Sequence, residues 1–190
     1  MLVGVGGQGV VLASSLLARA FLESGLDVKQ SEIHGMAQRG GSVTSCVRSA
    51  GSVGQRVFSP TIEPGEADAL IAFEQLEALR FCHYLKPGAL LVSSTQQIVP
   101  ITVSALGAVY PENIEQSIRE MGVELLMVDV ANVAAKCNNP RVGNVALVGA
   151  LAESLDIADD VWENAIRLTV PRALDANLQA FELGRQLGRR

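Results

Sequence analysis

The sequence MLVGVGGQGVVLASSLLARAFLESG, residues 1–25, joins a short apolar run to a cluster of glycines and then to a longer apolar segment. The first run is typical of a buried strand. The second places its apolar residues at helical spacing until Gly25. We therefore expect a strand, a tight turn at Gly4–Gly9 and a helix, which is a common opening unit of α/β folds.

The middle of the chain repeats this alternation, and its end is helical. Strand patterns occupy residues 67–73, 89–94 and 124–130, with a break expected at 86–88. Helix patterns cover residues 74–85, 111–122 with Pro111 in the first turn, 144–155, a segment from 159, and 172–187.

Two further segments carry strand patterns near the first helix. They are residues 27–34 and residues 42–49, and the glycines that follow predict that 51–60 returns as the hairpin partner of 42–49. The whole pattern predicts a single-domain, Rossmann-like three-layer α/β/α sandwich over residues 1–190, with a mostly parallel sheet and a hairpin at one edge.

Composition excludes several classes of function. The chain has 48% hydrophobic residues, a formal net charge of −5 and a pI near 5.1, and no basic run interleaved with aromatic residues. We therefore expect no binding to nucleic acid or to a membrane surface. The N-terminal apolar stretch lacks a basic flank and glycines interrupt it, so we expect no signal peptide and a cytoplasmic location.

The cysteines predict no metal site. Cys46, Cys82 and Cys137 lie far apart, without a Cys-x-x-Cys pair or a histidine at ligand spacing. We expect reduced, packed thiols and no metal or iron–sulfur cluster held by this chain.

The first glycine turn has the G-x-G-x-x-G spacing. In a strand-to-helix turn, such glycines let the backbone approach a diphosphate, and Glu32 stands near the position of the acidic residue that would hold a ribose. The same glycines also permit a tight turn and close helix packing without a ligand, so both interpretations stay open. The residues concerned are Gly4, Gly6, Gly7, Gln8 and Gly9.

The second glycine turn, within SEIHGMAQRGGSV at residues 31–43, gathers polar groups that suit a site wall. The adjacent glycines could offer outward N–H groups to an anion beside the guanidinium of Arg39, and His34 adds an imidazole. Alternatively, His34 and Arg39 anchor the loop to its own fold. The candidate residues are His34, Met36, Gln38, Arg39, Gly40, Gly41 and Ser42.

A third polar cluster comprises Asn139, Arg141 and Asn144. The amide of Asn144 is expected to accept hydrogen bonds from unpaired N–H groups of the helix that follows. Arg141 could pair with an acidic neighbour or point toward a partner chain, and the sequence does not decide between them.

The two glycine motifs together resemble a known family. VGVGGQGVVLAS followed by SEIHGMAQRGGSV is similar to the gamma-type subunits of the thiamine-diphosphate-dependent 2-oxoacid:ferredoxin oxidoreductases and, more narrowly, to the small subunits of the indolepyruvate type. The likeness continues through EADALIAFEQLEALR, LKPGALLVSS and NNPRVGNVALVGAL, so it covers nearly the whole chain.

The resemblance implies a small subunit of a complex that decarboxylates a 2-oxoacid oxidatively, with coenzyme A as co-substrate and ferredoxin as acceptor. Thiamine diphosphate, magnesium and iron–sulfur clusters are then expected on a larger catalytic subunit, because this chain lacks their motifs. The loop His34–Ser42 would face that subunit as interface or site wall, and no residue here is expected to be catalytic. The alternative hypothesis is a free-standing Rossmann-like dinucleotide-binding protein.

Overall fold

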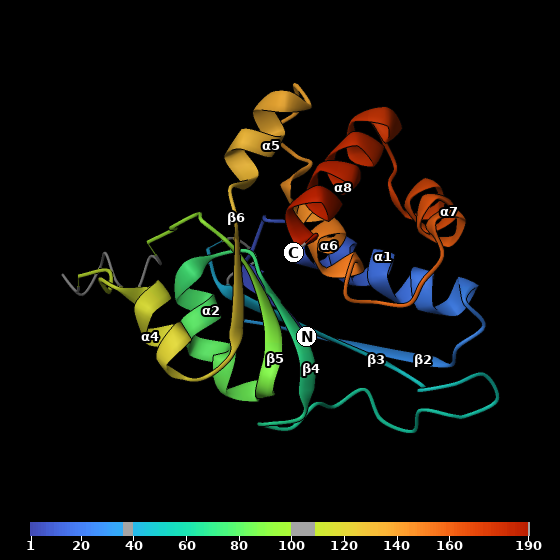
Figure 1. The fold of residues 1–190 in the computed structure, drawn as a ribbon, viewed down its shortest axis with the longest axis horizontal. Coiled ribbons are helices and arrows are strands. Elements are labelled where there is room, and N and C mark those ends of the chain that lie inside the picture. Colours follow the sequence, from blue (N-terminus) through green and yellow to red (C-terminus); the bar gives the residue numbers. More distant parts are fainter. Residues whose placement is uncertain (36–39, 100–108, 190) are drawn as a thin grey trace.

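A six-stranded mixed sheet forms the centre of the molecule, in a computed structural model that describes residues 1–35, 40–99 and 109–189 (Figure 1). The strands lie in the order β2-β3-β1-β4-β5-β6. Their bounds are β1 Leu2–Val5, β2 Val28–His34, β3 Ser42–Ser49, β4 Ala67–Ala72, β5 Leu85–Ser94 and β6 Glu124–Val128.

Four of these strands run parallel, and the other two form an antiparallel hairpin at one edge. β1, β4, β5 and β6 pair in parallel, whereas β3 pairs antiparallel with both β1 and β2. The sheet therefore has a hairpin at one edge, as predicted, although its two strands are not the pair that the sequence suggested. The hairpin joins β2 to β3, in a register that sets His34 opposite Val43.

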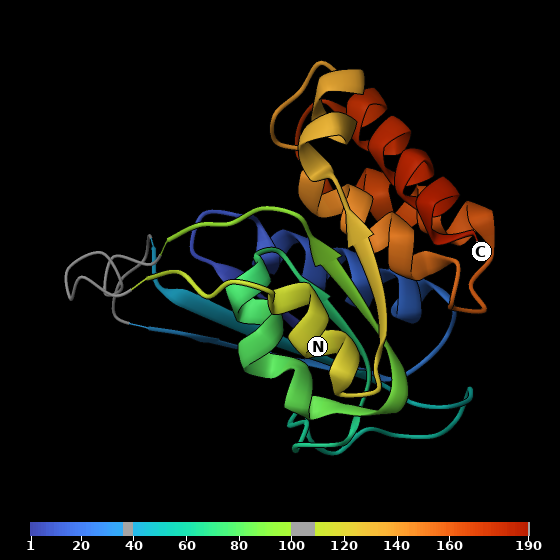
Figure 2. The same ribbon diagram turned by 60° about the vertical axis from the view of Figure 1, so that its left-hand side comes forward.

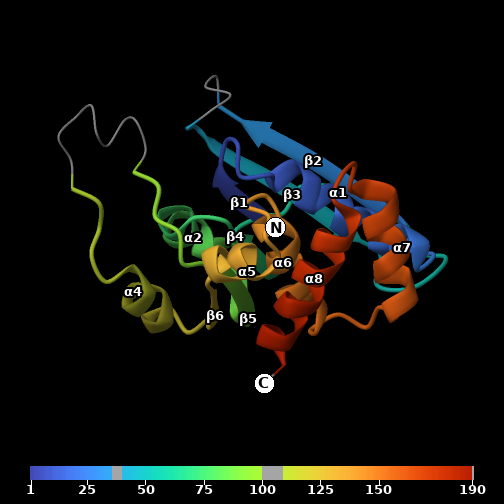
Figure 3. The same ribbon diagram turned by 90° about the horizontal axis from the view of Figure 1, so that it is seen from above.

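Helices cover both faces of the sheet, which confirms the three-layer sandwich (Figures 1 and 2). α2 and α4 lie on one face. α1 and α6 lie on the other, with α7 packed on α1, α8 on α6, and α5 against α6 and α8 (Figure 3). The helix bounds are α1 Val10–Glu23, α2 Gln75–Phe81, α4 Ile114–Glu120, α5 Val130–Lys136, α6 Gly143–Ala152, α7 Asp159–Thr169 and α8 Leu174–Gly188.

The strands divide their apolar residues between two cores, because successive side chains point to opposite faces. Leu2 packs with α1 and α6, whereas Val3 packs with α2 and α4. α6 is apolar on all sides and nearly every residue in it is buried, as expected of a helix held between the sheet and α8.

α6 and α8 cross unusually closely, at glycines of both helices. A Cβ on Gly149 of α6 would stand 2.2 Å from the carbonyl oxygen of Phe181, and a Cβ on Gly184 of α8 would stand 2.0 Å from that of Ala146. The missing side chains thus let the two backbones touch.

Several sequence-based expectations were wrong in detail. Residues 51–60 contain no strand, and β3 pairs instead with β2. β5 begins at Leu85, so residues 86–88 interrupt its pairing with β4 through a shift of register without ending the strand. Pro111 precedes the helical residues, since α4 begins at Ile114, and the short helix α5 was not predicted.

Across the described ranges, no helix is long and apolar enough to cross a membrane.

Candidate functional site

The crevice at the carboxyl ends of β1 and β4 is the expected ligand position in this topology. β1 and β4 are neighbouring parallel strands, and the helices that follow them, α1 and α2, lie on opposite faces of the sheet. Ligands of open α/β sheets bind at such a reversal of chain direction.

The side chain of Gln8 fills that crevice. Its Oε1 accepts a hydrogen bond from the N–H of Val5 at 2.8 Å, and its Nε2 donates to the carbonyl oxygen of Phe73 at 2.8 Å and to Gln96 Oε1 at 3.3 Å. Gln8 therefore bridges the ends of β1 and β4 where a diphosphate would approach the first turn of a dinucleotide-binding fold.

Close packing explains two of the glycines in the first turn. A Cβ on Gly4 would stand 2.8 Å from that of Phe73, and a Cβ on Gly9 would stand 2.4 Å from Asn144 Nδ2. Gly9 also has a φ of 82°, which disfavours other residues. The structural interpretation of the motif therefore accounts for these positions without a ligand.

Glu32 does not occupy the position of a ribose-binding acid. Its strand, β2, lies at the edge of the sheet with β3 between it and β1, about 10 Å away at the usual strand spacing. Glu32 is exposed, and its Oε1 accepts from Gln30 Nε2 at 3.2 Å. The antiparallel hairpin thus separates the two parts of the fingerprint.

The two glycine turns contact each other. The N–H of Gly6 donates to the carbonyl oxygen of Gly41 at 2.8 Å, and that of Gly40 points to the Gly6 oxygen at 3.4 Å. Gly40 has the positive φ, 78°, that its residue type suggests. Its N–H is directed inward, however, so the expectation of an outward anion-binding nest is wrong for Gly40.

The remaining residues of the second turn have separate environments. Ser42 begins β3, and its hydroxyl donates to Glu77 Oε2 at 2.5 Å. His34 ends β2 with an exposed side chain. Met36, Gln38 and Arg39 lie outside the described residues, so their predicted roles stay predictions.

A cleft of about 1260 Å³ lies beside the first glycine turn. It extends from the start of α1 and the end of β5 to α5, the start of α6 and the segment before α8. Its polar lining comprises Gln8, Ser94, Gln96, Asn138, Asn139, Arg141, Asn144, Arg172 and Asn177. The cleft thus joins the first and third sequence-predicted clusters.

The charged groups that line the cleft are both cationic. Arg141 and Arg172 are exposed in it, and within the described ranges neither guanidinium forms an ion pair. The starts of α1 and α6 also border the cleft, and neither helix has an acidic residue in its first turn. Both helix ends therefore add positive potential, which suits an anionic ligand.

The asparagines hold the backbone of this cleft. Asn144 lies in the first turn of α6, one residue inside the helix, and its Oδ1 accepts from the N–H of Val145 at 2.9 Å. The predicted capping role is wrong, because the cap position is occupied by Val142, whose side chain forms no hydrogen bond to the helix. Asn139 Oδ1 accepts from the N–H of Arg141 at 3.0 Å. Asn177 donates to the carbonyls of Arg172 at 3.3 Å and Ala173 at 2.9 Å.

Sequence reasoning missed Arg172, Gln96 and Asn177. Ala173 has a φ of 53°, a strained conformation for alanine, and the buried Asn177 side chain stabilises it. A polar residue three to four places into a helix, after a Pro-Arg-Ala step, was the available indication of such a turn.

The described residues offer no cluster of side chains for a metal ion. They include no group of three or more His, Cys, Asp or Glu side chains placed to hold a metal ion. Cys46, Cys82 and Cys137 are buried, and burial raises the pKa of the Cys82 and Cys137 thiols.

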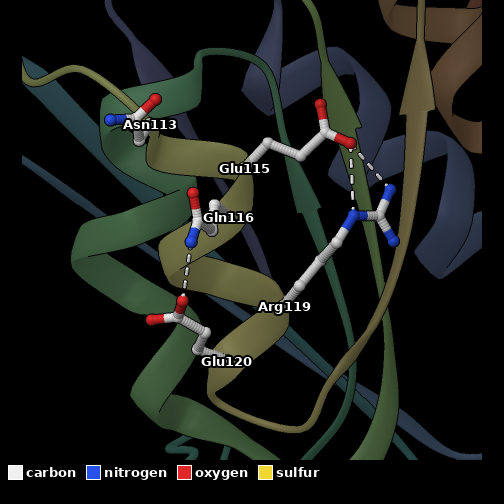
Figure 4. Close-up of a pocket in the computed structure, with 5 residues that line it drawn as sticks. All are labelled: Asn113, Glu115, Gln116, Arg119 and Glu120. Atoms are coloured by element: carbon white, nitrogen blue, oxygen red, sulfur yellow. Dashed lines mark hydrogen bonds and ion pairs between the residues drawn. The ribbon is translucent and has the colours of Figure 1, made fainter.

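A second hollow, of about 500 Å³, lies on α4 and carries no site (Figure 4). Its side chains pair with one another along the helix. Arg119 contacts Glu115 at 2.8 Å, and Gln116 contacts Glu120 at 3.0 Å (Figure 4). Such pairs are typical of a solvated helix surface.

Comparison with known proteins agrees with this architecture. The chain is 36% identical to indolepyruvate oxidoreductase subunit IorB of Thermococcus kodakarensis and 39% identical to that of Archaeoglobus fulgidus, over 97% of this chain and 92% of each relative. It is 26% identical to 2-oxoglutarate synthase subunit KorC of Methanothermobacter marburgensis, over 98% of this chain and 94% of that one.

Two solved structures share the fold. The gamma subunit of a keto/oxoacid ferredoxin oxidoreductase from Geobacter sulfurreducens matches with a TM-score of 0.69 and 22% identity, over 98% of this chain and 95% of that one. The 2-oxoglutarate:ferredoxin oxidoreductase from Magnetococcus marinus, solved with 2-oxoglutarate, coenzyme A and succinyl-CoA bound, matches with a TM-score of 0.71 and 20% identity, over 98% of this chain and 30% of that one. The family model for pyruvate ferredoxin/flavodoxin oxidoreductases matches residues 1–187, and this chain therefore belongs to that family, with the fold of its gamma-type small subunits.

Proposed function

We propose that this chain is the small subunit of an oxidoreductase complex that converts an aryl pyruvate and coenzyme A to an acyl-CoA and carbon dioxide, with ferredoxin as acceptor. The choice of an aryl pyruvate is supported by the higher identity to the indolepyruvate subunits than to the 2-oxoglutarate subunit. In such a complex a larger partner chain holds thiamine diphosphate, magnesium and iron–sulfur clusters. Thiamine diphosphate supplies the carbanion chemistry when bound there.

The contribution of this chain is a binding surface for the anionic end of coenzyme A. The observation that carries this proposal is the cleft with two unpaired arginines, two helix N-termini and no lining carboxylate among the described residues. Phosphates are bound well by guanidinium forks and by helix N-termini. The cleft is also larger than the roughly 300–1,000 Å³ of ordinary small-molecule sites, which suits a long ligand.

Each part of the cleft would act on a different portion of the ligand. Arg141 and Arg172 would neutralise phosphate charge, and the neutral amides of Gln96, Asn139 and Asn144 would accept and donate hydrogen bonds to polar groups. None of these side chains would exchange a proton with the reacting carbon. They would hold and orient the co-substrate while the chemistry takes place beside the partner chain.

The loop His34–Ser42 is proposed as the surface that faces the larger subunit. Its described ends, Gly35 and Gly40–Ser42, lie at the same edge of the sheet as the cleft, through the hydrogen bond between Gly6 and Gly41. Met36, Gln38 and Arg39 are retained as proposed interface or site-wall residues on the sequence resemblance alone.

Kinetics of the reconstituted complex test this function. Arg141→Ala and Arg172→Ala are each expected to raise the KM for coenzyme A about tenfold, because a charged hydrogen bond to phosphate is lost, with little change in the KM for the 2-oxoacid. Arg119→Ala, on the opposite face of the sheet, is the matched control. An unchanged KM for coenzyme A in both cleft variants would exclude the cleft as its site.

The isolated chain provides a second test. It should show no decarboxylation of a 2-oxoacid and should recover a role only when mixed with the larger subunit. Titration with NAD, NADP and FAD should give no binding, because Gln8 fills the crevice and Glu32 lies beyond β3. Turnover by the purified chain alone would contradict the proposed division of labour.

A further inference from the structure

Two glutamates at the start of α2 are almost completely buried. Glu74 is 0% exposed and Glu77 is 2% exposed, although carboxylates are rarely placed in a protein interior without partners. Glu74 caps the helix, since its Oε2 accepts from the N–H of Glu77 at 3.0 Å. One carboxylate suffices for that cap, so the remaining contacts need another explanation.

Glu77 contacts the strand that leaves the second glycine turn. Its Oε2 accepts from the hydroxyl of Ser42 at 2.5 Å, and its Oε1 accepts from the guanidinium of Arg80 at 2.6 Å. Ser42 follows Gly41, whose carbonyl oxygen accepts from the N–H of Gly6 in the first glycine turn. Glu77 therefore fixes the end of this loop against the turn that borders the cleft.

Glu74 contacts the segment that follows β5. Its Oε1 accepts from the N–H of Ile98 at 3.1 Å and from the hydroxyl of Tyr110. The Tyr110 oxygen in turn accepts from the N–H of Leu76 at 3.1 Å. Ile98 and Tyr110, which lie on either side of residues 99–109, thus contact the same carboxylate.

The cleft is joined to this group of contacts through Gln96. Its carbonyl oxygen accepts from the N–H of Gln75 at 3.1 Å, and its side-chain oxygen accepts from Gln8. A continuous hydrogen-bonded layer therefore runs from Ser42 through α2 to the polar lining of the cleft. Most of its members outside α2 come from segments that carry no regular structure of their own.

We propose that Glu74 and Glu77 are positioning residues. They hold the end of the Gly40–Ser42 turn and the segment around Ile98 in fixed positions relative to the cleft, so that the larger chain and the co-substrate bind to one preformed surface. The proposal rests on the function proposed above. Neither carboxylate lines the cleft, and each acts through the backbone or hydroxyl groups that it holds. If the two glutamates only stabilised α2, loss of the Ser42 or Tyr110 hydroxyl would not change the surface that binds the larger chain.

Removing single hydroxyls tests the proposal with matched controls on the chain itself. Ser42→Ala removes the contact with Glu77. Ser45→Ala removes a buried hydroxyl of the same strand that donates to the Ser31 carbonyl at 3.3 Å. The larger chain is titrated with each variant, and turnover reports the apparent affinity between the two chains. Ser42→Ala should weaken this affinity about tenfold, whereas Ser45→Ala should leave it unchanged. Ser42→Thr, which keeps a hydroxyl, should restore most of it.

The same comparison applies to Glu74. Tyr110→Phe should weaken the affinity for the larger chain by a similar factor. Tyr84→Phe, which alters the other tyrosine of the chain, should leave it unchanged. If Ser42→Ala and Tyr110→Phe match their controls in affinity, kcat and KM while the wild-type complex is active, the positioning role is excluded and the proposed function stands.

Hydrogen exchange can be measured on the isolated chain, whether or not an active complex forms. Failure to form an active complex would count against the proposed function alone, and the exchange result would still test the positioning role. The Gly6 amide, which donates to Gly41, should exchange about tenfold faster in Ser42→Ala than in Ser45→Ala. Equal protection of this amide in the two variants would overturn the proposal.

Discussion

Replacing Gly184 by alanine should destabilise the protein strongly, because α6 and α8 touch through their backbones at this point. The new Cβ would stand 2.0 Å from the carbonyl oxygen of Ala146 and 2.9 Å from its carbon. The oxygen is part of a helix and cannot rotate away, so α8 must move by about 1 Å to reach ordinary contact distances.

The size of the effect follows from two opposing contributions. A gap of 0.5–1 Å removes about a quarter to a half of the dispersion energy along an interface, and overpacking of a core costs about 1–3 kcal/mol or more. Alanine gains about 1 kcal/mol over glycine in a helix. Because the α6–α8 contact is the most extensive helix pair among the described residues, we expect the combined packing cost to lie above the typical range for overpacking, at about 3–5 kcal/mol. After the gain in helix propensity is subtracted, the net loss is about 2–4 kcal/mol.

Urea and thermal unfolding of the isolated chain measure this loss. For a chain of this size the expected decrease in Tm is roughly 5–15 °C. The control is Gly51→Ala, an exposed loop position where the nearest atom would be Gln55 Oε1 at 3.5 Å, and it should change stability by no more than about 0.5 kcal/mol. A Gly184→Ala protein as stable as the wild type would refute the close approach of the two helices.

Three further outcomes follow from the site. Gln8→Leu should lower the free energy of unfolding by about 1–3 kcal/mol, because the N–H of Val5 loses its partner, and urea unfolding against Leu12→Met as a control would measure it. Asn177→Ala should raise the KM for coenzyme A together with a loss of stability, since the strained turn that carries Arg172 loses two hydrogen bonds; a change in stability alone would separate the turn from the site. Burial and the contact with Glu74 raise the pKa of Tyr110, so the folded state keeps this phenol protonated after the unfolded state has ionised. Its contribution to stability is therefore complete below about pH 10, the ordinary tyrosine pKa, and decreases as pH rises above it. Tyr110→Phe should abolish this component in alkaline unfolding curves, and an identical alkaline loss in wild type and variant would contradict the assignment.

Much of the fold could be predicted because its central strands are continuous apolar runs. β1, β4, β5 and β6 are buried in a parallel sheet, and such strands need no alternation to be recognised. The partner of β3 could not be predicted in the same way. Local turn residues at Gly51 and Gly54 favoured a short hairpin, whereas the actual pairing uses β2, whose exposed edge position leaves little hydrophobic pattern.

The site was predictable only in part, because its components meet through tertiary structure. The glycine turn and the Asn139–Asn144 cluster were identified separately, and the cleft brings them together. Arg172 gave no local indication, since its position depends on the turn that Asn177 stabilises. Glu74 and Glu77 lie in a segment that resembles an exposed helix, and the sequence alone does not distinguish a buried carboxylate from a solvated one.

The bridge formed by Gln8 bears on which surfaces of the chain a small molecule and a partner chain can share. This side chain bridges the ends of β1 and β4, and the cleft beside it is lined by α5, the start of α6 and the segment before α8, whereas His34 and Ser42 lie outside the cleft lining. A small molecule in the cleft and a protein bound at His34 and Ser42 would then use different surfaces of the chain. If the cleft binds coenzyme A as proposed, we expect the co-substrate to exchange between turnovers without dissociation of the two subunits.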